Sequence, residues 1–195
     1  MLTERARSAS RGIVEPIAMA LARLGATANA LTIAGAALHV LVAWLVARGD
    51  LLVAGLVLIV AGSCDALDGS LARATGTASP FGAFLDSTLD RVSEALVFVG
   101  LLAYAQDLGD AMMGLIAQVG LSGSLMVSYA RARGAAIGCD TRVGVFDRFV
   151  RTALLAAGLL TGQIRPALWL LAAGAWWTVV QRVMDVRRQC VEGPR

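Results

Sequence analysis

Residues 51–105 read LLVAGLVLIVAGSCDALDGSLARATGTASPFGAFLDSTLDRVSEALVFVGLLAYA, two apolar stretches joined by a segment that carries four aspartates. The second stretch, Ala95–Ala105, would span about 16 Å as a helix, whereas a hydrocarbon core is about 30 Å thick. The first, Leu51–Cys64, is about 21 Å long by the same measure. We therefore predict that the first helix continues to about Ala74 and that the second begins near Phe81, which makes the pair a helical hairpin.

The four aspartates of this hairpin come to membrane depth when its helices are extended. Asp65 and Asp68 are spaced i,i+3, and each therefore lies on the same face of the first helix. Asp86 and Asp90, spaced i,i+4, share a face of the second helix. Counted from the turn at Gly76–Pro80, one aspartate of each pair lies at similar depth and the other about one turn deeper. We expect the four carboxylates to face one another across neighbouring antiparallel helices.

The composition places the whole chain in the membrane. It is 57% hydrophobic and 16% charged, with a mean hydropathy of +0.71, whereas soluble domains are nearer 45–50% apolar and about 25% charged. These values exclude disordered tails, coiled coils and a disulfide scaffold. Basic residues lie between apolar runs and not among aromatics on a polar face, so we expect no nucleic-acid partner.

The pattern predicts an all-α integral membrane protein forming a single domain over residues 1–195. Residues 1–26, with apolar residues at helical spacing between arginines, are interpreted as an interfacial amphipathic helix. Residues 27–188 form the bundle of six transmembrane helices, and 189–195 form a tail. The six apolar stretches are Leu31–Ala47, Leu51–Cys64, Ala95–Ala105, Ala111–Tyr129, Val145–Leu160 and Pro166–Val180.

The arginines orient this bundle. All 17 basic residues are arginine. Six antiparallel spans put Arg48 and Arg165 on one side and the other 15 on the side shared by both termini. The positive-inside rule makes that side the cytoplasm. We therefore expect a multi-pass protein of the cell membrane, with both termini and the aspartate site facing the cytoplasm.

Four carboxylates at this depth must be protonated, paired with arginine or bound to metal. Arg73 and Arg91 can neutralise at most two of them. Hard oxygen ligands without His or Cys favour Mg²⁺, Mn²⁺ or Ca²⁺ over zinc, and two divalent ions would balance four carboxylates. A dinuclear site of this kind suits phosphoryl-type chemistry. A charge network between helices is the structural alternative.

Small residues accompany the aspartates on the same helix faces. Gly69, Ala72 and Gly82 either allow close packing of helices or leave room for a nucleotide against the backbone. Spacing alone leaves both interpretations open.

The complete pattern Asp65-x2-Asp68-Gly69-x2-Ala72-Arg73-x8-Gly82-x3-Asp86-x3-Asp90 resembles the signature of the CDP-alcohol phosphotransferases. Six spans after an amphipathic N-terminal helix extend the resemblance to nearly the whole chain. It implies transfer of a substituted phosphate from a CDP-linked donor to an alcohol, with release of CMP, by an enzyme that forms a homodimer. It also implies that Mg²⁺ or Mn²⁺, as two ions, is held at Asp65, Asp68, Asp86 and Asp90.

The same resemblance assigns further roles. Asp90 is the catalytic general base that deprotonates the acceptor hydroxyl. The CDP-binding residues are Asp65, Asp68, Gly69, Ala72, Arg73 and Gly82. Near the N-terminus, Thr27–Thr32 resembles the family's entry to the first span; Thr27 or Asn29 is expected to cap that helix, and Asn29 to contact the nucleotide.

Three arginines suggest the acceptor. Ser128–Arg133, Asp147–Arg151 and Arg182 resemble the phosphatidylinositol phosphate synthase branch and its archaetidylinositol relatives. In that branch three basic side chains hold the phosphate of inositol phosphate, and they match Arg131, Arg151 and Arg182 here. The branch commonly has Lys at the position of Arg131 and Glu-Arg-Pro-Glu-Arg at residues 147–151. The remaining arginines in these regions are interpreted as membrane anchors or as groups around the site: Arg133, Arg142, Arg148, Arg187 and Arg188.

The favoured function is therefore transfer of a phosphatidyl group from CDP-diacylglycerol to inositol 1-phosphate. Phosphatidylglycerol phosphate synthesis from glycerol 3-phosphate is the nearest alternative, because that acceptor is also phosphorylated. A divalent-cation transporter is another, since buried carboxylates mark ion pathways, although transporters often show repeated broken helices. A non-catalytic membrane scaffold is the third.

Overall fold

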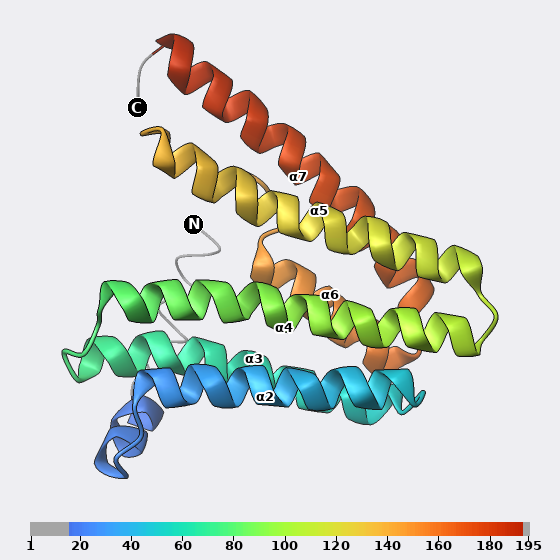
Figure 1. The fold of residues 1–195 in the computed structure, drawn as a ribbon, viewed down its shortest axis with the longest axis horizontal. Helices are drawn as coiled ribbons and strands as arrows, with labels where there is room; N and C mark the ends of the chain where they lie inside the picture. The colour runs from blue at the N-terminus through green and yellow to red at the C-terminus, as the bar shows by residue number, and fades with distance from the viewer. Residues whose placement is uncertain (1–15, 193–195) are drawn as a thin grey trace.

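The computed structural model describes residues 16–192, and within this range all regular structure is helical (Figure 1). Residues 16–23 form a short helix before the main bundle. The six long helices are α2 (Ala28–Ala47), α3 (Leu51–Ala74), α4 (Pro80–Asp107), α5 (Ala111–Ala136), α6 (Arg148–Thr161) and α7 (Ile164–Glu192). The predicted all-α class is confirmed.

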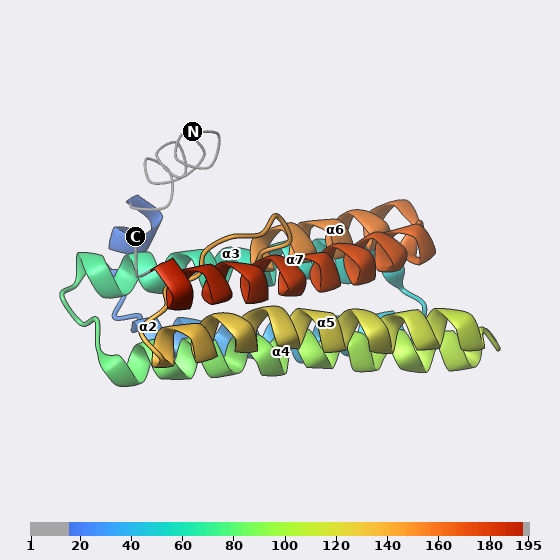
Figure 2. The same ribbon diagram turned by 90° about the horizontal axis from the view of Figure 1, so that it is seen from above.

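The long helices form two layers of three, seen from above in Figure 2. One layer contains α2, α4 and α5, and the other contains α3, α6 and α7. Helix α2 packs against both α3 and α4, α5 against α4 and α7, and α6 against α3 and α7. The order α2–α3–α6–α7–α5–α4 thus closes into a ring. Its apolar interior includes Leu58, Phe98, Leu101, Leu168 and Leu171, each at most 2% exposed.

The hairpin of α3 and α4 has the predicted extent but a different setting. Both helices run through the aspartates, as the short apolar stretches required. The expectation that they are packed neighbours is wrong: they lie in different layers, and α2 packs against both. Gly100 permits this arrangement, because a side chain there would overlap the backbone of Ala43 in α2. The carboxylates therefore face the space between the layers.

The turn between α3 and α4 fixes the register of the aspartates. Gly76 has a φ of +68°, a conformation that suits glycine. Ser79 then caps α4, its hydroxyl accepting the N–H of Gly82 at 3.0 Å. Pro80 occupies the first turn, where its missing N–H costs nothing.

Among the helices of residues 16–192, three, α2, α3 and α5, are long and apolar enough to cross a membrane. Helix α4 carries the charged site, α7 has charges at both ends, and α6 has 14 residues, about 21 Å of helix. Helix α6 begins at Arg148 and not at Val145, because Asp147 is its N-cap and accepts the N–H of Val150 at 3.0 Å.

The ends of the chain differ from expectation in one respect. Helix α7 continues to Glu192, so residues 189–192, predicted as tail, are helical. The predicted interfacial helix over 1–26 falls mostly on residues 1–15, which lie outside the described range.

Candidate active site

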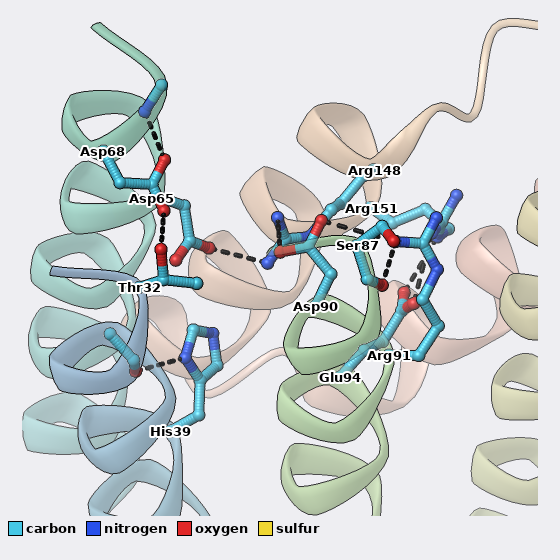
Figure 3. A network of polar contacts seen from close by, with 12 residues as sticks. Thr32, His39, Asp65, Asp68, Ser87, Asp90, Arg91, Glu94, Arg148 and Arg151 are labelled. Carbon is cyan, nitrogen blue, oxygen red and sulfur yellow. Dashed lines mark hydrogen bonds and ion pairs between the residues drawn. The ribbon is translucent and has the colours of Figure 1, made fainter. Parts of the chain in front are cut away.

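Asp65 and Asp68 of α3 and Asp90 of α4 lie toward the space between these two helices (Figure 3). Asp68 is buried, with 5% of its surface exposed, and the other three predicted metal ligands are half-buried. The hydroxyl of Thr32, on α2, lies 2.7 Å from Oδ2 of Asp68. The backbone N–H of Gly69 donates to Oδ1 of Asp68 at 2.5 Å. Helix α2 thus supplies a donor that fixes a predicted metal ligand of α3.

A cavity of about 240 Å³ lies where α2, α3 and α4 meet. Two of the aspartates, Asp68 and Asp86, line it. Asn29 also lines it, while Thr27 caps α2 by accepting the N–H of Ala30 at 3.2 Å. Of the predicted CDP-binding residues, the cavity brings together Asp68, Gly69, Ala72, Arg73 and Gly82.

The glycines of this cavity keep it open. A methyl group on Gly82 would lie 3.2 Å from the Ser79 hydroxyl and 3.4 Å from Oδ1 of Asn29. A methyl group on Gly69 would lie 3.3 Å from Nη1 of Arg73. A side chain at either position would therefore crowd the residues that line the cavity.

Asp65 and Asp90 are held on the other side of the site by Arg148, the first residue of α6. Its Nη2 donates to Oδ2 of Asp65 at 2.6 Å, and its Nη1 pairs with Oδ1 of Asp90. Arg91 adds a longer contact, 3.5 Å from its Nη1 to Oδ2 of Asp90. Of the two interpretations of Arg148, the membrane anchor is wrong: this residue contacts two predicted metal ligands. Asp65 consequently does not line the cavity of about 240 Å³ found between α2, α3 and α4.

The predicted acceptor arginines lie on three helices. Arg151, on α6, is 1% exposed and pairs with Glu94 of α4 through two bonds, Nε to Oε1 at 2.9 Å and Nη2 to Oε2 at 3.2 Å. Arg182, on α7, is 5% exposed and lies within electrostatic reach of both Arg131 and Arg151. Arg131 is exposed near the end of α5. The three charges are therefore grouped at one end of the bundle.

Two of these arginines also hold the connection between α5 and α6. Arg151 donates from Nη1 to the carbonyl of Phe146 at 3.0 Å, and Arg182 donates from Nε to the carbonyl of Val143 at 3.1 Å. Nη1 of Arg182 donates to the carbonyl of Val127. A guanidinium has five N–H donors, and these contacts occupy three in Arg151 and two in Arg182. The remaining N–H donors, two of Arg151 and three of Arg182, belong to side chains that are buried.

Comparison with known proteins assigns the chain to a family. A model of the CDP-alcohol phosphatidyltransferases matches residues 26–183. The chain belongs to this family. It is therefore a membrane-bound transferase, and the predicted resemblance is confirmed.

Individual relatives agree with the family match. The chain is 36% identical over 181 residues to the archaetidylinositol phosphate synthase of Pyrococcus horikoshii, covering 92% of this chain and 94% of the relative. It is 37% identical over 194 residues to the phosphatidylinositol phosphate synthase of Corynebacterium glutamicum, covering 94% and 88%.

Solved structures of the phosphatidylinositol phosphate synthase of Mycobacterium tuberculosis have the same fold. The structure with bound CDP-DAG matches with a TM-score of 0.83 and 33% identity, covering 89% of this chain and 93% of that one. A structure of the same protein in complex with manganese and citrate matches with a TM-score of 0.82 and 32% identity, covering 89% and 88%.

The aspartates of this phosphatidyltransferase have the right chemistry for a divalent ion, since they supply hard oxygen donors. Within residues 16–192, however, no three acidic, histidine or cysteine side chains are grouped closely enough to hold one. Arg148 bonds to both Asp65 and Asp90, and Asp68 is turned toward Thr32. The donors fit a metal, but these contacts must rearrange to bind it.

Sequence reasoning did not assign Thr32, Gly35 or Glu94 to the site, and it left Arg148 open between a membrane anchor and a group around the site. Thr32 is the last residue of the Thr27–Thr32 motif at the start of α2, and its place in that motif was the one indication in the sequence that it could belong to the site. Glu94 lies one turn beyond Asp90 and pairs with Arg151 of α6. Gly35 of α2 lies against Asp65 of α3, and Arg148 of α6 binds Asp65 and Asp90; such contacts between helices leave no signal in the local sequence.

Proposed function

We propose that the protein transfers the phosphatidyl group of CDP-diacylglycerol to inositol 1-phosphate, giving phosphatidylinositol phosphate and CMP. The observation that carries the acceptor is the grouping of Arg131, Arg151 and Arg182 from three helices: Arg182 donates to the carbonyls of Val127, one turn before Arg131, and of Val143, and Arg151 donates to the carbonyl of Phe146 in the same connection. A phosphorylated alcohol is dianionic, and guanidinium groups suit phosphate oxygens. An unphosphorylated acceptor would need no such grouping. The names of the relatives agree with this acceptor.

The cavity between α2, α3 and α4 is the proposed site of the donor nucleotide. Gly69, Ala72 and Gly82 leave room against the backbone, and Arg73 adds a positive charge at its rim. The proposed CDP-binding residues are Asp65, Asp68, Gly69, Ala72, Arg73 and Gly82. The solved relative with bound CDP-DAG supports a CDP-linked lipid donor.

We propose that two Mg²⁺ or Mn²⁺ ions are held by Asp65, Asp68, Asp86 and Asp90. When bound, the ions neutralise the donor diphosphate and stabilise the charge that develops on departing CMP. The relative solved with manganese supports a metal of this class.

The remaining chemistry belongs to the side chains. Asp90 accepts the proton of the acceptor hydroxyl, and that oxygen attacks the phosphorus that bears the diacylglycerol. The bond from this phosphorus to the bridging oxygen breaks, and its electron pair leaves with CMP. The arginines fix the acceptor phosphate so that the attacking oxygen is held in line, which lowers the entropic cost of reaction.

The proposed topology follows from the arginine distribution. All six helices, α2 to α7, cross the membrane after an N-terminal interfacial helix, and the site and both termini face the cytoplasm. In a variant whose three native cysteines are replaced by serine, labelling of Gln163→Cys and of Arg142→Cys, both at exposed positions, with an impermeant reagent on intact cells tests this orientation: only the first site should react. Family resemblance further suggests a homodimer, which light scattering of the detergent-solubilised protein tests by mass.

The deciding experiment measures CMP release from CDP-diacylglycerol in detergent with Mg²⁺. Inositol 1-phosphate, glycerol 3-phosphate, inositol and serine are compared as acceptors. Turnover with inositol 1-phosphate alone supports the proposal. Turnover with glycerol 3-phosphate alone keeps the family and overturns the acceptor, and absence of turnover with all four overturns the proposed reaction.

A matched pair of variants tests where the acceptor binds. Arg131 and Arg133 are both exposed and lie two residues apart on α5. We expect Arg131→Gln to raise the KM for inositol 1-phosphate about tenfold, because it removes a charge-assisted hydrogen bond, and Arg133→Gln to leave it unchanged. Equal effects of both variants would contradict the placement.

A further inference from the structure

Arg148 joins two helices that lie in different layers of the bundle. Its guanidinium bonds to Asp65 on α3 at 2.6 Å and pairs with Asp90 on α4, and Figure 3 shows it between the two carboxylates. About 31% of the Arg148 side chain is exposed, against 16% for Asp65 and 13% for Asp90. One guanidinium thus pairs with both half-buried anions, and Arg91 adds a longer contact to Asp90 at 3.5 Å.

The guanidinium occupies one oxygen of each carboxylate, Oδ2 of Asp65 and Oδ1 of Asp90, and a divalent ion held by both aspartates would compete with it for the space between them. A guanidinium nitrogen sits at about 2.7–2.9 Å from a carboxylate oxygen, whereas Mg²⁺ requires oxygen ligands at about 2.0–2.1 Å in near-octahedral geometry. Two positive groups at one pair of carboxylates also repel each other. Arg148 therefore cannot keep its present contacts with Asp65 and Asp90 when both carboxylates bind a metal.

The two ends of the Arg148 side chain differ in freedom. Its backbone opens α6, which is fixed by the Asp147 cap and, three residues later, by the buried pair of Arg151 with Glu94. The partly exposed guanidinium, on a long flexible stem, can turn away while the helix stays in place.

We propose that Arg148 is a positioning residue that serves as an internal cation. In the metal-free protein it holds Asp65 and Asp90 together across the bundle, and metal binding displaces it from both carboxylates. This inference rests on the proposed metal site. It predicts two opposite effects of Arg148: the side chain stabilises the metal-free protein, and it weakens metal binding.

Titration of the detergent-solubilised full chain with Mn²⁺ by calorimetry, together with thermal unfolding with and without Mn²⁺, tests both effects. Residues around metal sites typically change affinity about 10–100-fold. We expect Arg148→Gln to bind Mn²⁺ about tenfold more tightly and to unfold at a lower temperature than the wild type without metal. Arg142→Gln is the control, because Arg142 is 74% exposed and pairs only with Asp140 of the same loop among the described residues; it should change neither quantity.

A merely structural role for Arg148 would lower stability without raising affinity. Unchanged or weaker Mn²⁺ binding by Arg148→Gln, with the wild type binding normally, therefore overturns the inference and leaves the proposed function intact. Failure of the wild type to bind Mn²⁺ overturns the proposed metal site and the inference together.

Two measurements keep the test open if Arg148→Gln does not fold. Arg148→Lys retains the charge but lacks the planar fork. Its Mn²⁺ affinity should therefore lie between that of the wild type and the roughly tenfold tighter affinity expected for Arg148→Gln. Unchanged or weaker binding overturns the inference. In the wild type, saturating Mn²⁺ should speed phenylglyoxal modification of Arg148 several-fold, measured by peptide mass spectrometry. Arg142 is the internal reference, and equal rates with and without Mn²⁺ also overturn the inference.

Discussion

The backbone of α2 at Gly35 lies against the carboxylate of Asp65: a methyl group on Gly35 would sit 2.8 Å from Oδ1. Asp65 is therefore confined on one side by this helix and on the other by its bond to Arg148. The position of a predicted metal ligand thus depends on a residue of another helix that has no side chain.

Gly35→Ala should impair the enzyme by moving Asp65. The contact is shorter than a methyl group tolerates, so the carboxylate must shift, and small displacements of reacting groups are costly. We expect kcat/KM for CMP release to fall about tenfold or more, with weaker Mn²⁺ binding. Gly62→Ala is the matched control, since a methyl group there would lie 4.0 Å from Thr152, and it should retain activity. Full activity of Gly35→Ala would contradict this account.

Thr32 should matter through its hydroxyl. The hydroxyl is buried and lies 2.7 Å from Oδ2 of Asp68, so Thr32→Val leaves that oxygen without its donor, while Oδ1 keeps the N–H of Gly69. We expect Mn²⁺ affinity to fall about tenfold, the scale typical of groups that orient metal ligands. Thr32→Ser keeps the hydroxyl and should retain most of the affinity. If calorimetry finds the Val and Ser variants equal, the hydrogen bond does not orient Asp68.

Asp90→Asn tests the general base. The amide cannot accept the hydroxyl proton, so we expect kcat to fall about 100- to 10,000-fold while Mn²⁺ binding is retained through the other carboxylates. Asp107→Asn, at the opposite end of α4 and exposed, is the control and should behave as the wild type. An Asp90→Asn enzyme with undiminished turnover would show that another group takes the proton.

Local features of the sequence were enough to predict the helices and the site aspartates. The apolar stretches before Asp65 and after Asp90 were too short to cross a bilayer, which required both helices to extend through the acids. Helical spacing then placed each aspartate pair on one face. These inferences depend on neighbours within a few turns, and the structure has α3 and α4 at the expected lengths.

Partners across the bundle could not be predicted in this way. Arg148 and Asp65 are 83 residues apart, and Arg151 and Glu94 are 57 apart. Periodicity gives the face of a helix but not the helix it meets, so α3 and α4 were taken as neighbours when α2 packs against both. An arginine at a helix start is also explained as a membrane anchor. The sequence alone could therefore not decide between that interpretation and a place around the site for Arg148.

The buried pair of Arg151 with Glu94 connects stability to acceptor binding. Both Glu94 oxygens accept from Arg151, and the two side chains are 1% and 10% exposed. Glu94→Ala leaves the guanidinium without its counterion, which typically costs about 3–5 kcal/mol. We expect a lower unfolding temperature, and a KM for inositol 1-phosphate raised about tenfold with the KM for CDP-diacylglycerol little changed.

This split between the two substrates distinguishes positioning of Arg151 from a general loss of packing. Glu94→Gln keeps one oxygen acceptor and should lie between the wild type and Glu94→Ala in both unfolding temperature and acceptor KM. In the double variant Glu94→Ala/Arg151→Ala, no unpaired charge remains, so its loss of stability should be smaller than the sum of the two single losses. Equal increases in KM for both substrates would mean that Glu94 supports the fold of the site as a whole and does not orient the acceptor arginine.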